Sequence, residues 1–180
     1  MTLRNATADD VESIGELISG LAEYEGLAHE VAWTVDELRQ QLFGAGSSTR
    51  VTLAVHDATG EVAGFALWFP TFSTFRGDHG IWLEDLFVKP EFRGHGYGQE
   101  LLALLRASTT GRVEWMVLDW NEASIKFYDS LGAAPVPGWT RYRWVGAASV
   151  DGAAHDGAAH DDAAQDGAGQ DGAGQVDRRP

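Results

Sequence analysis

The sequence predicts an α/β fold (α+β in stricter usage) of three layers, built on a mixed, mostly antiparallel central sheet. Two helical patterns come first, and a β-hairpin pattern follows them. After the hairpin, strand and helix patterns alternate, so crossovers through helices are expected to place parallel strands in the sheet. The length of 180 residues, with 44% hydrophobic side chains, suits one domain with a single sizeable core.

Two capping sequences predict the first two helices. In Thr7-Ala8-Asp9-Asp10 an acidic residue follows the threonine three positions later, and Thr34-Val35-Asp36-Glu37 repeats this arrangement. Hydrophobic residues at helical spacing follow each cap, and Gly44 ends the second pattern. These hydrophobic positions are Val11, Ile14, Leu17, Ile18 and Leu21 in the first helix, and Leu38 and Leu42 in the second.

Alternating hydrophobic residues predict the strands. A hairpin of strands over 51–55 and 62–69 is expected, with a polar loop over 72–80 and a further strand over 81–88 behind it. Lys89-Pro90 ends this strand, and a glycine-rich turn leads into a helix that begins near Gly98. The remaining elements expected are a strand over 113–118, a helix over 121–131 and a last strand over 139–145.

The composition changes abruptly after the last predicted strand, so we place the folded domain at residues 1–147 and a tail at 148–180. Between Asp151 and Gln175 the tail consists of five pentapeptides of the DGAAH and DGAGQ type, with alanine as the only hydrophobic residue. Such a segment cannot bury enough area to offset an ordering entropy of about 1–2 kcal/mol per residue. We therefore expect an acidic, disordered tail, in which His155 and His160 make a poor metal site.

Charge and composition exclude several classes of function. The formal net charge is −14, and −9 of it falls within residues 1–150. A negative surface repels nucleic acid and anionic membranes and favours cationic partners, although it can also serve solubility alone. No stretch approaches the roughly 18–20 apolar residues of a membrane span, and the N-terminus lacks the apolar core of a signal peptide, so a cytoplasmic protein is expected. The chain has no cysteine, and the spacing of its histidines is not that of metal ligands, so no metal is expected.

The turn Arg93-Gly94-His95-Gly96-Tyr97-Gly98 stands directly between a predicted strand and a predicted helix. Its alternate glycines let successive backbone N–H groups point at one place. The positive end of the following helix adds to this, so the turn suits a pyrophosphate. A Walker-type site is disfavoured because no Gly-Lys-Ser/Thr follows, and the glycine spacing differs from that of a dinucleotide fingerprint.

Two longer motifs make this interpretation specific. The run LEDLFVKPEFRGHGYG at 83–98 resembles the acetyl-CoA motif of the GCN5-related N-acetyltransferase (GNAT) superfamily, and WNEASIKFY at 120–128 is similar to its second cofactor motif. With LAEYE at 21–25, these look most like the diamine branch, the spermidine/spermine and thialysine N-acetyltransferases. The resemblance covers about residues 2–145. It implies the GNAT acyl-CoA N-acyltransferase fold, acetyl-CoA as co-substrate and, often, a homodimer.

The resemblance also implies which residues hold acetyl-CoA. The end of the strand before the glycine-rich turn would pair through its backbone with the pantetheine arm, where this strand splays from its parallel neighbour. The turn would hold the pyrophosphate, and the start of the helix over 121–131 would lie close to the cofactor. The expected cofactor-binding residues are Leu86, Phe87, Val88, Arg93, Gly94, His95, Gly96, Tyr97, Gly98, Gln99, Asn121 and Ser124.

Two side chains are candidates for proton transfer. An alkylamine is mostly protonated at neutral pH, so its acetylation needs a group that accepts a proton. Glu84 is the candidate base, because strand alternation points it and Asp85 to opposite sheet faces and only one can face the cleft; the alternative is an ordinary solvent-facing residue. Tyr128 is the candidate acid, since positions 121, 124 and 128 share one helix face and the motif matches. The alternative for Tyr128 is a packed ring with a wet hydroxyl.

A negative, aromatic pocket for a cationic substrate is expected from Tyr24, Glu25, Glu84 and Asp85. Compared with the polyamine enzymes, Ser73 stands where they carry an aspartate, and Pro137-Gly138 replaces an acidic pair. We therefore expect a small cationic amine as substrate, either a diamine or polyamine or a thialysine-like amino acid. A protein or peptide acceptor and a non-catalytic CoA-binding module are the alternatives.

Overall fold

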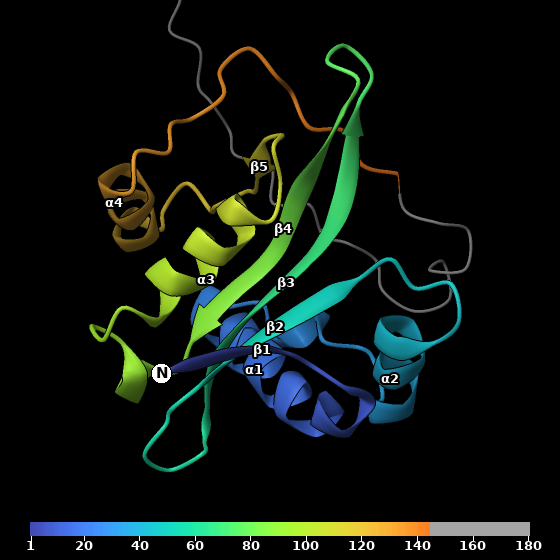
Figure 1. Cartoon of the computed structure of the whole chain (residues 1–180), viewed down its shortest axis with the longest axis vertical. Coiled ribbons are helices and arrows are strands. Elements are labelled where there is room, and N and C mark those ends of the chain that lie inside the picture. The colour runs from blue at the N-terminus through green and yellow to red at the C-terminus, as the bar shows by residue number, and fades with distance from the viewer. Residues whose placement is uncertain (145–180) are drawn as a thin grey trace, which may run out of the picture. The chain divides into compact units, whose positions relative to one another are not determined.

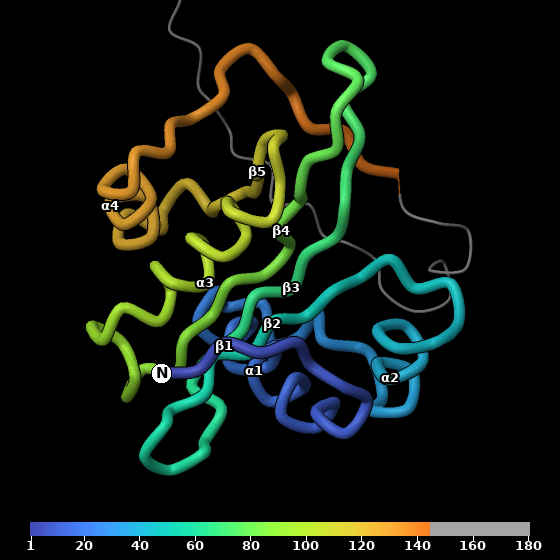
Figure 2. Tube along the Cα trace, in the orientation of Figure 1, coloured from blue at the N-terminus to red at the C-terminus, as the bar shows by residue number. Residues whose placement is uncertain are grey.

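The computed structural model of the protein describes residues 1–144. The chain divides into two compact units, Met1–Pro135 and a second that begins at Val136, and the described residues of the second form no helix or strand. The first unit contains every candidate site residue, and its path can be followed in Figures 1 and 2.

The first unit is built on a five-stranded sheet with the order β1-β2-β3-β4-β5 (Figure 1). Neighbouring strands run antiparallel, except that β5 is parallel to β4. This confirms the mixed, mostly antiparallel sheet predicted from the order of the elements. The strands are β1 (Thr2–Asn5), β2 (Arg50–Val55), β3 (Val62–Ser73), β4 (Asp78–Val88) and β5 (Val113–Glu114).

Four α-helices and three short 3-10 helices complete the unit. Thr34 caps α2 as predicted, because its hydroxyl accepts a hydrogen bond from the Glu37 backbone amide and the Glu37 carboxylate accepts one from the Thr34 backbone amide. The α-helices are α1 (Val11–Glu25), α2 (Val35–Phe43), α3 (Tyr97–Ala107) and α4 (Glu122–Ser130). The 3-10 helices are η1 (Ala8–Asp10), η2 (Ala28–Glu30) and η3 (Pro90–Phe92).

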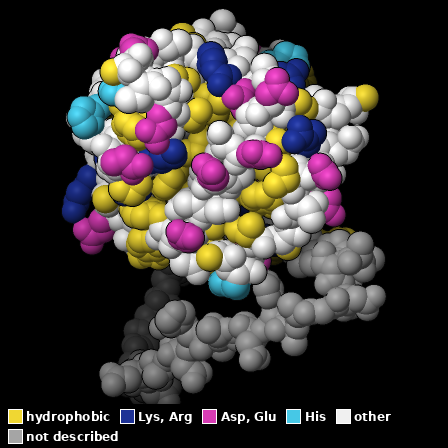
Figure 3. All heavy atoms as spheres, turned by 90° about the horizontal axis from the view of Figure 1, so that it is seen from below, with side chains coloured by type: hydrophobic (Ala, Val, Ile, Leu, Met, Phe, Trp, Pro, Cys, Tyr) yellow, Lys and Arg dark blue, Asp and Glu magenta, His cyan; other side chains and the backbone are white. Residues whose placement is uncertain are grey.

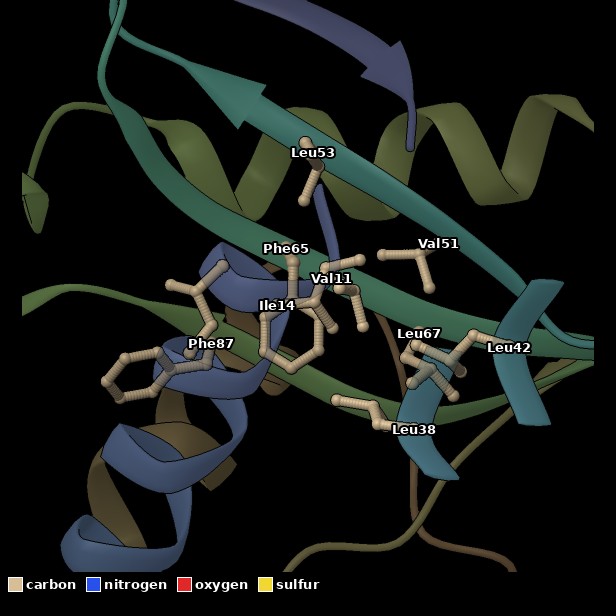
Figure 4. Close-up of a cluster of buried hydrophobic side chains, with 10 residues drawn as sticks. Val11, Ile14, Leu38, Leu42, Val51, Leu53, Phe65, Leu67 and Phe87 are labelled. Atoms are coloured by element: carbon tan, nitrogen blue, oxygen red, sulfur yellow. The ribbon is translucent and has the colours of Figure 1, made fainter. Parts of the chain in front are cut away.

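Hydrophobic side chains bury both faces of the sheet, which makes the fold three-layered. On one face, residues of α1 and α2 pack against β2, β3 and Phe87 of β4 (Figure 4). On the other face, Tyr97, Leu101 and Leu105 of α3 pack against small residues of β2 and β3 and against β4. Full burial of one Leu or Phe side chain contributes roughly 1.5–3 kcal/mol, so these two clusters hold the layers together.

Three strand predictions needed correction. The strand β1 was missed, because only Leu3 of its four side chains packs against a core cluster and no alternation marks it. The expected loop over 72–80 is mostly hairpin, since β3 and β4 pair as far as Ser73 and Asp78. The strand expected over 113–118 is β5, which ends at Glu114.

The last expected strand, over 139–145, was also wrong for the residues that the structure describes. Residues 139–144 are not in a strand, and the side chains of Trp139, Tyr142 and Trp144 are exposed. Alternation predicts a strand only where a neighbouring strand completes its hydrogen bonds, and sequence spacing does not reveal that neighbour. The predicted tail over 148–180, like Val145, lies outside the described residues.

Within residues 1–144, no helix is long and apolar enough to cross a bilayer.

Candidate active site

The glycine-rich turn lies between η3 and α3, where the sequence placed it. Gly94 and Gly96 have φ of 77° and 83°, a conformation that favours glycine. A side-chain carbon at either position would meet no other atom within 4 Å, so the turn faces open space. Gly96 is the N-cap of α3 and offers no side chain to the first amides of the helix. These amides and the helix dipole can therefore receive an anion, as a pyrophosphate requires.

The side chains of Arg93 and His95 both contact backbone carbonyls, Arg93 at the end of β4 and His95 within the turn. The Nε of Arg93 donates to the Val88 carbonyl at 3.0 Å, and its guanidinium lies 5.0 Å from the ring centre of Tyr24. Nδ1 of His95 lies 2.8 Å from the carbonyl oxygen of Arg93. The Arg93 side chain is thus held beside the end of β4 and against the last turn of α1.

The edge of β4 next to this turn is open. β4 pairs with β5 only at Ile81 and Trp82, but it pairs with β3 as far as Val88. From Leu83 onward, its edge towards β5 therefore has no paired strand within the described chain. Backbone groups of residues 86–88 at this edge can hydrogen-bond an extended amide-containing arm, which is the fit that pantetheine requires.

A β-bulge in β4 changes how its two acidic residues face. The register shifts so that Leu67 pairs with Asp85 and Trp68 with Leu83, which leaves Glu84 as the extra residue. Leu83 belongs to the cluster under α3, whereas Phe87, two residues beyond Asp85, belongs to the cluster under α1. Simple alternation, on which the choice between Glu84 and Asp85 rested, therefore does not hold across this position.

Asp85 is the more buried of the two carboxylates. Its burial, together with the charges of Glu84 and then Glu25, raises the pKa of Asp85 to about 6. Glu84 is exposed, and its Oε2 accepts a hydrogen bond from the indole Nε1 of Trp82 at 2.7 Å. The pair thus offers one desolvated carboxylate and one that remains in contact with solvent.

Glu25 and Tyr128 complete the acidic part of the site. Burial raises the pKa of Glu25. Burial, and then the charge of Glu25, raises the pKa of Tyr128 to about 12. The Tyr128 ring packs against Trp115 with ring centres 4.9 Å apart, a contact that the sequence did not reveal because the two residues lie on different elements. The end of α1, β4 and α4 therefore bring three of the predicted residues together.

Tyr24 contacts both the start of α4 and the glycine-rich turn, which the sequence did not predict. Its hydroxyl donates to Oδ1 of Asn121 at 3.1 Å, and the same oxygen accepts the Ser124 amide as the N-cap of α4. Asn121 is 5% exposed, so its side-chain oxygen is fully used inside the fold. The ring of Tyr24 also lies 6.1 Å from that of Trp120 and carries Arg93 on its face.

Outside this cluster, the other residues singled out from the sequence have local roles. Ser73 is buried at the end of β3, where its Oγ accepts the Arg76 amide across the tight turn to β4. On the face shown in Figure 3, acidic side chains are more frequent than basic ones, in keeping with the net charge of −14. Among residues 1–144, no group of three or more His, Cys, Asp or Glu side chains is arranged to hold a metal ion.

Known proteins are similar to this chain in sequence and in fold. A family-wide sequence model described as the acetyltransferase (GNAT) family matches residues 18–133. The chain is 33% identical to thialysine N-epsilon-acetyltransferase from Bos taurus, over 81% of this chain and 93% of that protein. It is 29% identical to L-ornithine N5-acetyltransferase NATA1 from Arabidopsis thaliana, over 81% of this chain and 85% of that protein. The solved structure of an integron cassette protein from V. cholerae superposes with a TM-score of 0.67 at 25% identity, covering 81% of this chain and 93% of that one.

Proposed function

The chain belongs to the acetyltransferase (GNAT) family and is an N-acetyltransferase, and from that premise we propose that its acceptor is a primary amine of a small cationic substrate. The substrate class is a diamine or polyamine, or a thialysine-like amino acid. The observation that carries this proposal is the group of Glu25, Asp85 and Tyr128: burial raises the pKa of all three, and the charge of Glu25 adds to the rise for Asp85 and Tyr128. Buried carboxylates are costly unless a positive group joins them, and an alkylammonium supplies that charge.

Acetyl-CoA, which GNAT acetyltransferases use, supplies an electrophilic thioester when it is bound. In this chain, the amides of the glycine-rich turn and of the first turn of α3 would hold its pyrophosphate. The open edge of β4 at residues 86–88 would hold its pantetheine arm. Arg93 lies beside both and adds a positive charge. The remaining predicted contacts are His95, Gln99, Asn121 and Ser124, and Asn121 would act mainly by holding the start of α4.

The acidic residues would bind and deprotonate the amine. Asp85 and Glu25 would hold the ammonium by charge, because Asp85 is largely shielded from water and Glu25 partly so. Glu84 would accept the proton, directly or through a water, and its exposure lets that proton leave to solvent. Asp85 is the alternative acceptor, since a pKa of about 6 suits a general base near neutral pH.

Tyr128 would act on the leaving sulfur. Its raised pKa of about 12 keeps the hydroxyl protonated at neutral pH. The hydroxyl can therefore donate a hydrogen bond, and then a proton, as negative charge develops on the sulfur. Packing against Trp115 and Phe127 fixes the ring, so the hydroxyl points in one direction.

A short substrate with two charged groups fits this chain better than a long polyamine. The position where the polyamine enzymes carry an aspartate is Ser73, whose oxygen is used by its own turn. Two relatives named above are, by their names, acetyltransferases of the amino acids thialysine and ornithine. Both names describe substrates with a side-chain amine, which supports an amino-acid-like acceptor here.

The test is acetyl-CoA consumption by the full chain with a panel of amines: thialysine, ornithine, lysine, putrescine, spermidine, spermine and a basic peptide. We expect the highest kcat/KM with a small diamine or a diamino acid, and a loss of at least about tenfold in Asp85→Asn. Turnover with the peptide alone would replace the proposal with a protein or peptide acceptor. Binding of CoA with no turnover on any amine would favour a binding module. The homodimer stays a prediction, which light scattering of the purified chain can test.

The same panel separates the two candidates for the proton acceptor. If Glu84 accepts the proton, Glu84→Gln lowers kcat while Asp85→Asn mainly raises the KM of the amine. If Asp85 accepts it, the acidic limb of the kcat/KM profile near pH 6 persists in Glu84→Gln and disappears in Asp85→Asn. The second pattern would reassign the base.

A further inference from the structure

Three aromatic side chains form a cluster next to the glycine-rich turn. Phe92 stands immediately before the turn and Tyr97 immediately after Gly96, with their ring centres 6.0 Å apart and their planes nearly perpendicular. The third ring is His56, whose centre lies 5.4 Å from that of Phe92 and 6.5 Å from that of Tyr97. His56 comes from the end of β2, so a distant part of the chain contacts both ends of the turn.

His56 is joined to Tyr97 by a hydrogen bond as well as by ring contact. Its Nδ1 lies 2.7 Å from the Tyr97 hydroxyl, and the two residues are 41 positions apart in the sequence. Tyr97 is 5% exposed, so its hydroxyl is withdrawn from solvent and His56 supplies a polar partner. Tyr97 is also the first residue of α3, so the bond fixes the helix end whose amides face the turn.

The segment that carries His56 is itself anchored. The His56 amide donates to the Glu61 carbonyl at 2.8 Å and closes the turn between β2 and β3. Lys89, at the other end of the glycine-rich segment, forms an ion pair with Glu61 at 3.2 Å and donates its amide to Ala63. Figure 2 shows the β2–β3 turn and the segment before α3 at the same end of the sheet. His56 therefore lies on a hairpin turn that hydrogen bonds and an ion pair hold to the segment before α3.

Such support has a physical consequence for anion binding. Glycine permits the backbone conformation that the turn adopts, but it also permits many other conformations when no contact restricts the turn. A turn that becomes ordered only when the ligand binds loses conformational entropy, and this loss weakens the affinity. A turn that is already held in its binding conformation avoids that loss. His56 and Phe92 both contact the ring of Tyr97, and His56 also bonds its hydroxyl, whereas a side-chain carbon at Gly94 or Gly96 would meet no other atom within 4 Å.

We propose that His56 is a positioning residue for acetyl-CoA, which holds the phosphate-binding turn in its binding shape through the hydroxyl of Tyr97. The proposal rests on the assignment of the pyrophosphate to this turn under the proposed function. It does not depend on which amine is acetylated. His56 contacts Phe92, Tyr97 and Glu61 rather than Glu25, Glu84, Asp85 or Tyr128, so its influence would be on the affinity for the cofactor.

The experiment measures the dissociation constant of CoA by calorimetry on the full chain, together with kcat and KM. His56→Phe keeps a ring and removes the hydrogen bond, whereas His56→Asn keeps a polar atom at the position of Nδ1. We expect His56→Phe to raise the Kd for CoA and the KM for acetyl-CoA by about 5- to 10-fold, as the loss of one buried hydrogen bond predicts. The kcat at saturating acetyl-CoA and the KM of the amine should stay within twofold, and His56→Asn should restore most of the affinity.

The control is His79→Phe, because His79 stacks on Phe72 in the distant hairpin of β3 and β4 and touches no part of the turn. Tyr97→Phe removes the same hydrogen bond from the other side, so it tests the proposal even if His56→Phe does not fold. An unchanged Kd in His56→Phe or in Tyr97→Phe, or equal losses in kcat and affinity, would overturn the proposal. If the wild-type chain binds no CoA at all, the assignment of the turn fails first, and that result is distinct from an unchanged Kd in the variants.

Discussion

Asp85→Asn should make the protein more stable at neutral pH while it impairs acetylation. The carboxylate of Asp85 is ionised at neutral pH although it is buried and lies near two other carboxylates. Its pKa rises from 3.8 to about 6, and one pKa unit corresponds to about 1.4 kcal/mol, so ionised Asp85 costs the fold about 3 kcal/mol. Between these two pKa values the folded chain binds more protons than the unfolded chain, so this cost grows as the pH rises through them.

The measurement is urea unfolding of the wild type and Asp85→Asn at pH 4.5 and at pH 8, without acetyl-CoA or amine. The variant should be more stable at both values, by about 1 kcal/mol at pH 4.5 and by about 3 kcal/mol at pH 8. Groups far from Asp85 titrate in both proteins alike, so the difference between the two proteins reports Asp85 and its interaction with the neighbouring carboxylates of Glu84 and Glu25. The matched control is Glu84→Gln, which removes the same charge from an exposed neighbour and should give a smaller pH-dependent gain.

A stability difference between the wild type and Asp85→Asn that does not grow from pH 4.5 to pH 8 would refute the reasoning. It would mean that burial and the neighbouring carboxylates do not destabilise the ionised form of Asp85. A variant that is more stable and equally active would refute the functional half of it. Proteins keep a destabilising buried charge where a substrate or a reaction needs it. Loss of activity together with a gain in stability is therefore the result expected for Asp85→Asn.

Three further substitutions test the remaining parts of the site. Tyr128→Phe should lower kcat by about 100-fold or more with little change in the Kd for CoA, as expected for a general acid, and equal turnover would remove Tyr128 from the mechanism. Gly96→Ala should lower stability by about 1–2 kcal/mol through its positive φ alone, because the added carbon meets open space, and should weaken CoA binding; an unchanged Kd would show that the turn does not hold the cofactor. Tyr24→Phe should raise the Kd for CoA and lower the melting temperature by a few degrees through the lost bond to Asn121, whereas an unaltered melting temperature would contradict that bond.

The glycine-rich turn could be predicted from sequence because its shape is local. The glycines at 94, 96 and 98 indicate a tight turn, because Gly94 and Gly96 adopt positive φ values that other residues avoid. The neighbouring strand and helix patterns show where the turn lies in the chain. The cap of α2 was predictable for the same reason, since it involves residues three positions apart. Contacts of this kind leave a spacing that can be read along the chain.

The sequence singled out Glu25, Glu84, Asp85 and Tyr128 but could not predict how they face one another. Strict alternation gave Glu84 and Asp85 opposite faces, and the bulge at Glu84 removed the basis of that argument. A bulge depends on the register of two strands, and the sequence of one strand does not contain it. The same limit explains the missed strand β1, which depends on pairing with β2, and the hydrogen bond between His56 and Tyr97.

The last turn of α1 links the two halves of the site. Tyr24 and Glu25 are adjacent, so on a helix their side chains project about 100° apart. Tyr24 contacts Arg93 and Asn121, while Glu25 raises the pKa values of Asp85 and Tyr128. Gly26, in the left-handed region at φ 74°, ends the helix directly after them and bonds back to its carbonyls. Because one capped helix end carries both side chains, a movement of that helix end would change the contacts of Arg93 and Asn121 and the charge near Asp85 and Tyr128 together.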